Sequence, residues 1–369
     1  MSIVTNNQLM IDEIMQEPKL FSQILKNKTH YTEGFVNLLT SKNIKKIVFI
    51  GSGSPSHLSV SLKYAAIKLL KVEAIVELPS LFLYHNSFNV GNAYNPDEML
   101  LICPVESGRT KGPYLAALQA KELGISVVCT TLDENGPLAS VSDVVIKKPS
   151  GAELAPPSTK GHSTGILILL LCMIEAAMRK GTISAKEYEN YQVGFSELPS
   201  NIEKAAKNTL DWFELHKEVV MNSKNYWFLA YGANYGTATE AVLKFLESHQ
   251  KNTFAYELEE FLHGPLCAVN TDDVVFFLAA ENGPEKDRLL LLYDTMKKSY
   301  PNCVLIQSNE NPIEDVLAIT LNSVNLEFLN ALEFLIPIQV LSYIIADNIG
   351  IDITIWTTKS IREVMKPSL

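Results

Sequence analysis

The sequence predicts an α/β protein with two similar, doubly wound domains, each a mostly parallel, five-stranded sheet flanked by helices. Three observations indicate this fold class. Short apolar runs alternate with helical stretches, which is typical of βαβ units. The order of these runs occurs twice, and an apolar strand leads into Gly51 in the first half and into Gly232 in the second. Each half then ends in a long apolar helix.

The expected elements correspond between the two halves. Strands are predicted in pairs, at 46–50 and 226–230, 99–103 and 274–278, 127–130 and 303–306, and 144–146 and 317–319. Helices are predicted at 8–25, 31–41, 58–70, 114–123, 164–178, 237–249 and 326–348, and a strand and turn at 254–266. The closing helix of each half is continuously apolar, so we expect it to be buried.

These elements predict five regions along the chain. They are N-terminal helices at 1–43, a first sheet domain at 44–181, a helical linker at 182–224, a second sheet domain at 225–350 and a tail at 351–369. Within the linker, Pro199 predicts the start of a new helix.

Composition limits the class of function. The chain has 369 residues, 47% of them apolar, which suits two domain cores, and a formal charge of −10 that disfavours nucleic acid and anionic membrane surfaces. Its five cysteines are an odd number without a CxxC pair, which favours buried, reduced thiols. The N-terminus lacks the pattern of a signal peptide, and the apolar run at 164–174 is too short to span a bilayer. We therefore expect a soluble, cytoplasmic protein.

Three polar loops are candidates for holding an anion. One contains Gly51, Ser52, Gly53 and Ser54, a second contains Glu106, Ser107, Gly108, Arg109 and Thr110, and a third spans 151–164 and includes Ser158 and Thr159. The first two follow strands and precede helices, where free backbone N–H groups and hydroxyls can surround a phosphate. The first loop matches neither the dinucleotide-binding glycine pattern nor the Walker A motif. Helix capping alone is the alternative interpretation.

A candidate reactive group lies on the predicted helix at 237–249. Lys244 and Glu247 are three residues apart and therefore share a face of that helix. A surface ion pair is the simplest interpretation of this spacing. The helix is followed, however, by a Glu-rich segment that runs into His263-Gly264-Pro265. A carboxylate and a histidine can both act as general acids or bases.

Together these motifs resemble the sugar isomerase (SIS) domain, which binds phosphosugars. The strand-GSGS-helix, the SGxT loop, the Glu-x-x-x-x-Ser-Thr-Lys segment and the order E-…-E-x-x-H-G-P-L carry the resemblance, which covers nearly the whole chain. Arranged twice, they are similar to the isomerase half of glucosamine-6-phosphate synthase, to amino-sugar-phosphate deaminases and to fructosamine-6-phosphate deglycases. A glutaminase domain is not expected, because position 2 is Ser2.

The resemblance implies roles for individual residues. Glu247 would move a proton between C1 and C2 of the open-chain sugar, Lys244 would orient it, and His263 would assist ring opening across a dimer interface. Lys359, in a tail segment that matches the family's Lys-Ser, would open the ring or form a Schiff base. Phosphate would be held by Ser52, Ser54, Ser107 and Thr110, with help from Ser158 and Thr159.

Three positions depart from the family pattern. Pro55 and Val105 replace residues that are usually serine, and Glu106 replaces an uncharged donor. A carboxylate repels phosphate, so Arg109 is expected to offset it, or Glu106 to accept sugar hydroxyls. We interpret these changes as an altered substrate geometry.

The expected function is an amino-sugar-6-phosphate deaminase or isomerase, or a fructosamine-6-phosphate deglycase, that uses no metal and no cofactor. Its expected partners are the phosphosugar and further copies of the chain, in a homodimer with a shared active site or in a higher oligomer. A plain aldose–ketose isomerase and a non-catalytic sugar-phosphate sensor are the alternatives. A sensor is disfavoured because residues 1–42 lack the length and basic charge of a DNA-binding motif.

Overall fold

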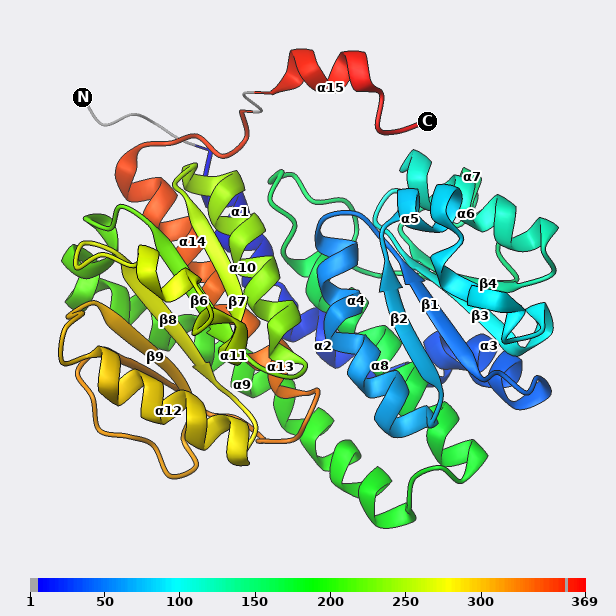
Figure 1. Ribbon diagram of the computed structural model, residues 1–369, viewed down its shortest axis with the longest axis horizontal. Helices are drawn as coiled ribbons and strands as arrows, with labels where there is room; N and C mark the ends of the chain where they lie inside the picture. The colour runs from blue at the N-terminus through cyan, green and yellow to red at the C-terminus, as the bar shows by residue number, and fades with distance from the viewer. Residues whose placement is uncertain (1–5, 356–357) are drawn as a thin grey trace. The chain divides into compact units, whose positions relative to one another are not determined.

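The computed structural model describes residues 6–355 and 358–369 (Figure 1). They form two compact units, which we call the first and second sheet domains. The first contains residues 20–152, 161–193 and 358–369, and the second contains residues 6–19, 153–160 and 194–355. Each domain is therefore assembled from separate stretches of chain.

The first sheet domain is a five-stranded sheet in which every paired strand is parallel. Its strand order is β2 (Glu73–Glu77), β1 (Lys46–Ile50), β3 (Met99–Pro104), β4 (Ser126–Thr131) and β5 (Val144–Lys147). Its helices of seven residues or more are α2 (Glu17–Lys26), α3 (Lys28–Ser41), α4 (Ser54–Ala65), α5 (Pro79–His85), α6 (Lys111–Glu122), α8 (Lys160–Lys180) and α15 (Lys359–Met365). β2 was not predicted, because its outer residues are partly exposed and Glu73 and Glu77 interrupt the apolar pattern.

Both faces of this sheet are covered. Val48 and Ile50 of β1 pack in one core cluster with Phe82 of α5 and Ala116 of α6. On α8, a side chain at Gly165 would meet Leu58 of α4 at 3.3 Å, so these two helices lie against each other. A parallel sheet needs helices on both faces, and this need explains the continuously apolar strands.

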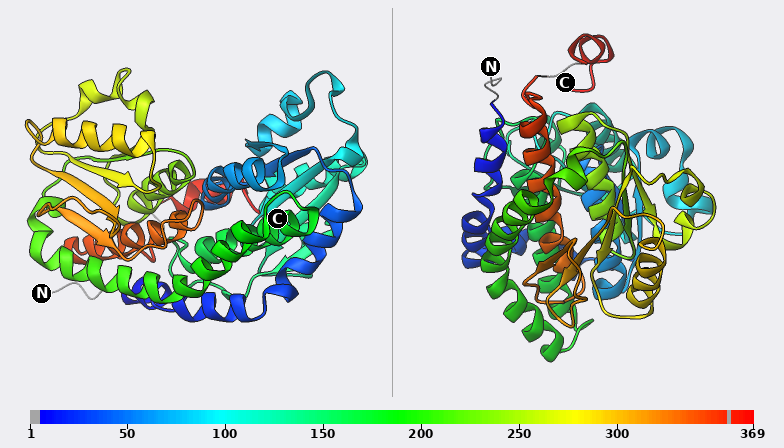
Figure 2. Two further views of the ribbon diagram at one scale, coloured as in Figure 1. Left: turned by 90° about the horizontal axis from the view of Figure 1, so that it is seen from below. Right: turned by 90° about the vertical axis from the view of Figure 1, so that its left-hand side faces the viewer.

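The second sheet domain repeats the topology. Its order is β10 (Ala318–Leu321), β9 (Cys303–Ser308), β8 (Val274–Ala279), β6 (Tyr226–Ala230) and β7 (Thr253–Glu257), again all parallel. Its helices are α1 (Gln8–Ile14), α9 (Ala185–Met221, which begins in the first domain), α10 (Asn234–His249), α11 (Leu258–Phe261), α12 (Pro284–Met296), α13 (Asn330–Glu333) and α14 (Leu335–Ile349). Figure 2 shows helices on both faces of each sheet. The predicted fold class, with two five-stranded parallel sheets flanked by helices, is confirmed.

Alternation along β6 sorts its side chains between the two faces. Trp227 and Leu229 join the core cluster that contains Tyr293 of α12. Tyr226 and Phe228 stand on the opposite face, where both rings meet Phe245 of α10 edge-on at centroid distances of 5.1 and 5.0 Å. Because successive strand residues point to opposite faces, this packing holds α10 in a fixed rotation against the sheet.

Two helix predictions were wrong. The helix expected at 8–25 is two helices, α1 and α2, because Pro18 has no N–H for a helical hydrogen bond and disfavours helical geometry at the residue before it. The break expected at Pro199 is absent, and α9 continues through it. The buried side chains of Leu198 and Ile202 flank this proline, and their burial outweighs a local cost of about 3 kcal/mol.

Among the residues that the structure describes, two helical stretches, at 160–180 and 330–349, are long and apolar enough to cross a membrane by length and composition alone. In the most apolar 18-residue segment of each helix, 89% and 72% of the residues are buried inside the protein, respectively. This burial is expected for core helices of a sheet domain. Cys103, Cys129, Cys172 and Cys303 are buried free thiols and Cys267 is exposed, in line with the prediction of mostly buried thiols.

Candidate functional site

The first anion loop is a sharp turn between β1 and α4. Gly53 has φ +66° and ψ −137°, a backbone conformation that favours glycine, and a side chain at Gly51 would meet the backbone of Pro55 at 2.6 Å. Ser52 is exposed, while Ser54 is buried at the start of α4. The loop therefore presents the hydroxyl of Ser52 and the first turn of a helix at the carboxyl edge of the sheet.

The second anion loop follows the adjacent strand, β3. Gly108 has φ +68°, and a side chain there would meet the hydroxyl of Thr131 at 2.9 Å. Ser107 is exposed and accepts a hydrogen bond from the backbone N–H of Arg109 at 3.3 Å. β1 and β3 are hydrogen-bonded neighbours, so the two loops share one edge of the first sheet.

Glu106 is neutralised by a residue that the sequence did not indicate. Its carboxylate forms an ion pair with Lys148, whose side chain is only 2% exposed and whose amine also donates to the carbonyl of Gly161 at 3.2 Å. The Arg109 guanidinium instead pairs with Asp133 at 3.1 Å. The expectation that Arg109 offsets Glu106 was therefore wrong, because Lys148 does so from just beyond β5.

Replacing Lys148 by methionine is expected to lower the melting temperature strongly. The change removes the buried cation that pairs with the partly exposed carboxylate of Glu106, and breaking a buried pair in this way typically costs about 3–5 kcal/mol. The same change at the neighbouring Lys147, in an exposed pair with Glu134, is expected to have almost no effect. Adding Glu106→Gln to Lys148→Met should recover most of the loss in thermal denaturation, and an equal loss in the Lys147 and Lys148 variants would contradict this pairing.

The tail contacts the second anion loop. The N–H of Lys111 donates to the carbonyl of Pro367 at 2.9 Å, the N–H of Leu369 donates to the carbonyl of Arg109 at 2.9 Å, and Thr110 bridges to Ser368. A hollow of about 570 Å³ beside this contact is lined by the tail and by Ser52 and Thr110 among others. The predicted site residue Lys359 begins α15, but its side chain lies outside the described part of the chain.

The central part of the third polar loop, residues 153–160, belongs to the second sheet domain. The Glu153 carboxylate accepts hydrogen bonds from the hydroxyl of Ser158 at 2.6 Å and from the N–H and hydroxyl of Thr159 at 2.6 and 3.0 Å. Thr159 is fully buried and Ser158 partly so. Glu153 therefore holds this loop together, a role that the Glu-x-x-x-x-Ser-Thr-Lys motif alone does not indicate.

The α10 helix carries a buried ion-pair cluster. The Lys244 amine lies 2.8 Å from the Glu247 carboxylate and 3.4 Å from that of Glu240, and the side chains of Lys244 and Glu240 are each 1% exposed. Burial alone would lower the pKa of Lys244, but the charges of Glu240, Glu247 and the more distant Glu153 raise it above its usual value. Lys244 is thus a fixed cation, and the surface-pair interpretation was wrong.

Glu247 is the accessible member of this cluster. Its side chain is 21% exposed, so one carboxylate of the cluster reaches the surface while the other, Glu240, is sealed. Glu240 was missed, although its spacing of four residues before Lys244 could have indicated it.

His263 lies on an exposed turn of the second sheet domain. It follows α11, whose first N–H groups are capped by the carboxylate of Glu257. The neighbouring Glu259 pairs with Arg288 at 2.7 Å and so has a structural partner. No described contact joins His263 to Glu247 directly.

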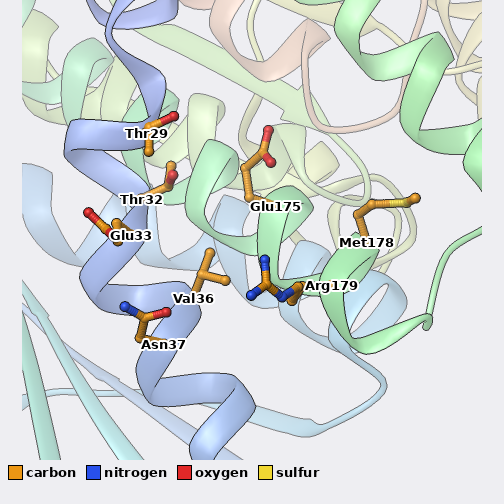
Figure 3. Close-up of a pocket in the computed structure, with 8 residues that line it drawn as sticks. All are labelled: Thr29, Thr32, Glu33, Val36, Asn37, Glu175, Met178 and Arg179. Carbon is orange, nitrogen blue, oxygen red and sulfur yellow. The ribbon is translucent and has the colours of Figure 1, made fainter.

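A separate hollow of about 520 Å³ lies on the first sheet domain. Figure 3 shows its lining residues on α3 and α8, among them Glu33, Glu175 and Arg179. None of the predicted site residues lines it. Glu175 is instead engaged by Lys28, at 2.8 Å, in a polar cluster that also includes Tyr188.

The parallel sheet is duplicated. One copy carries polar loops at its carboxyl edge, and the other carries a buried Lys–Glu cluster on a helix. These features define a doubly wound ligand-binding protein. Residues 220–343 of the chain match the SIS domain family. The matched residues include all five strands of the second sheet domain, and the first domain repeats its topology.

Curated and solved relatives are similar over most of the chain. A glutamine–fructose-6-phosphate aminotransferase of Clostridium perfringens is 25% identical over 93% of the chain, which spans 57% of that relative's length. The C-terminal domain of glucosamine-fructose-6-phosphate aminotransferase from Francisella tularensis superposes with a TM-score of 0.82 at 22% identity, covering 92% of this chain and 95% of that one. A glucosamine-6-phosphate deaminase of Thermotoga maritima gives a TM-score of 0.69 at 20% identity, covering 94% and 96%. These solved structures share the fold.

Proposed function

We propose that the protein is a phosphosugar-processing enzyme, an amino-sugar-6-phosphate deaminase or isomerase or a fructosamine-6-phosphate deglycase. The observation that carries the proposal is the cluster on α10, in which a buried cation fixes one accessible carboxylate. The curated relatives are named for fructose 6-phosphate and one solved relative for glucosamine 6-phosphate, which supports a sugar phosphate as substrate.

In this proposal Glu247 moves a proton between C1 and C2 of the open-chain sugar. Two features of the cluster support this role. Lys244 stays protonated, because carboxylates flank it, so it orients Glu247 and does not exchange protons itself. The side chain of Glu247 is 21% exposed, whereas the buried Glu240 balances the charge of Lys244.

Phosphate is held, in the same proposal, by Ser52, Ser54, Ser107 and Thr110, on the two adjacent loops of the first sheet domain. The pairing of Glu106 with Lys148 supports anion binding there, because the carboxylate no longer adds an uncompensated negative charge. Ser158 and Thr159 assist by shaping the loop around Glu153, since their hydroxyls are donated to it.

His263 and Lys359 act at the ring oxygen and the carbonyl carbon. The exposure of His263 supports its use by a second subunit, and we propose a cytoplasmic homodimer with a shared active site. A plain aldose–ketose isomerase remains the second candidate, supported by the same cluster, since the proton transfer is common to both reactions.

A substrate panel tests this function. The full chain is incubated with hexosamine 6-phosphates and fructosamine 6-phosphates, and released ammonia or amino acid and the sugar product are both measured. We expect amine release together with a ketose or aldose phosphate. Sugar product without amine would favour the plain isomerase, and binding without turnover of any member would contradict an enzymatic function.

A further inference from the structure

The carboxyl edge of the second sheet has the same topology as the anion-holding edge of the first. The loop after β6, at 231–233, corresponds to the loop after β1, and the loop after β8, at 280–283, corresponds to the loop after β3. In parallel α/β sheets this edge is where ligands bind. The reacting cluster does not use it, because Glu247 is 13 residues from Asn234 along α10, about 20 Å of helix.

The backbone at this edge leaves open space. Gly232 has φ +53° and Gly283 has φ +145°, and a side chain built on either glycine meets no atom within 4 Å. At Gly51 and Gly108, the corresponding turns of the first domain, such a side chain would collide with protein atoms at 2.6 and 2.9 Å. The second edge is therefore the more open of the two around its glycines.

Buried polar atoms at the same edge lack partners. Among the residues that the structure describes, Oδ1 of Asn234, both polar side-chain atoms of Asn330 and the hydroxyl of Ser308 have no hydrogen bond, and all three residues are at most 1% exposed. Asn234 and Asn330 lie near each other, since the hydroxyl of Thr237, one turn into α10, contacts the carbonyl of Ala331 at 3.4 Å. Unsatisfied buried amides are costly, which indicates that something else satisfies them.

The charge at this edge is negative. Asn234 Nδ2 lies 3.4 Å from the carboxylate of Glu281, and the hydroxyl of Tyr231 donates to the Glu281 carbonyl at 2.9 Å. Burial raises the pKa of Glu281 to about 7, and the charges of Glu327 and Glu285 add to this effect. Lys286 is the nearby cation, and its amine is engaged by Asn282 at 2.9 Å. Such an edge repels phosphate and suits hydroxyl groups or an ammonium group.

We propose that this edge, at Asn234, Glu281 and Asn330, is a second ligand site, for an amino sugar without phosphate. The amides bind its hydroxyl groups and Glu281 binds its ammonium group. The site is separate from the proposed reaction and stands whether or not that reaction is confirmed.

Glucosamine is the probe, titrated calorimetrically into the full chain at pH 7.3, with glucose and glucosamine 6-phosphate in parallel. We expect saturable binding of glucosamine, at least tenfold weaker binding of glucose, and at least a tenfold loss of glucosamine affinity in Glu281→Gln. Thr110→Val, in the first domain, should weaken the binding of glucosamine 6-phosphate and leave the binding of glucosamine unchanged. The proposal would be overturned if the chain does not bind glucosamine, or if Glu281→Gln binds it as tightly as the unaltered chain does. It would also be overturned if Thr110→Val abolishes the binding of glucosamine.

A second measurement separates loss of binding from loss of folding. Because the pKa of Glu281 is raised above that of an unfolded glutamate, the folded chain loses stability as pH rises from about 5 to 7. Four other titratable groups face the carboxyl group of Glu281 and stay in place in the variant. They are Glu285 on α12, Glu327 before α13, Tyr231 after β6 and Lys286. Glu281→Gln is therefore expected to reduce the difference in melting temperature between pH 5 and pH 8. An unchanged difference would show that this carboxyl group does not sit in the environment described, and would overturn the proposal.

Discussion

Replacing Glu247 by glutamine is expected to lower turnover of the phosphosugar by about 10²–10⁴-fold while its dissociation constant changes little. Glutamine has the same shape and still accepts a hydrogen bond from Lys244, but it cannot take up a proton. The fold should persist, because Lys244 keeps the buried carboxylate of Glu240 at 3.4 Å. Turnover and binding are measured separately, by steady-state kinetics and by calorimetry with the same sugar phosphate.

The matched control for this variant is Glu203→Gln. Glu203 also pairs with a lysine on a helix, Lys207 at 2.7 Å, but both side chains are about half exposed. This control is expected to leave turnover unchanged. Unaltered turnover in Glu247→Gln would remove Glu247 from the mechanism, whereas a parallel loss of binding would assign it to substrate positioning.

The fold class could be predicted from the sequence because buried parallel strands are continuously apolar. β1 and β6 are entirely buried and were found, whereas β2 is partly exposed and was missed. The continuation of α9 through Pro199 could not be predicted either, since it depends on tertiary burial of the neighbouring side chains and not on local propensity.

The candidate site was predictable where a motif is local in sequence. Lys244 and Glu247 lie within one turn of α10, so their spacing indicates their pairing. The partner of Glu106 is 42 residues away, and only the parallel pairing of the strands brings Lys148 to it. Arg109 likewise forms its ion pair with a residue far away in the sequence, Asp133, which its own motif does not indicate.

Replacing Lys244 by methionine is expected to have the largest effect on stability of any single change on α10. The Lys244 side chain is 1% exposed and lies between two carboxylates, so its removal takes a buried cation away from the buried carboxylate of Glu240. Breaking a buried ion pair in this way typically costs about 3–5 kcal/mol. The expected result is a large fall in the free energy of unfolding in urea.

The pH dependence of this loss identifies its cause. Without the charge of Lys244, the buried Glu240 carboxylate is disfavoured only while it is charged, so the destabilisation should shrink as pH falls toward 4 and the carboxyl group takes up a proton. Lys207→Met removes the cation of the exposed pair with Glu203 and is expected to change the stability little at every pH. If Lys244→Met is as stable as Lys207→Met at pH 7, the buried cluster does not hold α10 in place. If its loss is the same at pH 4 and pH 7, the cost comes from lost packing of the lysine chain and not from the charge of Glu240.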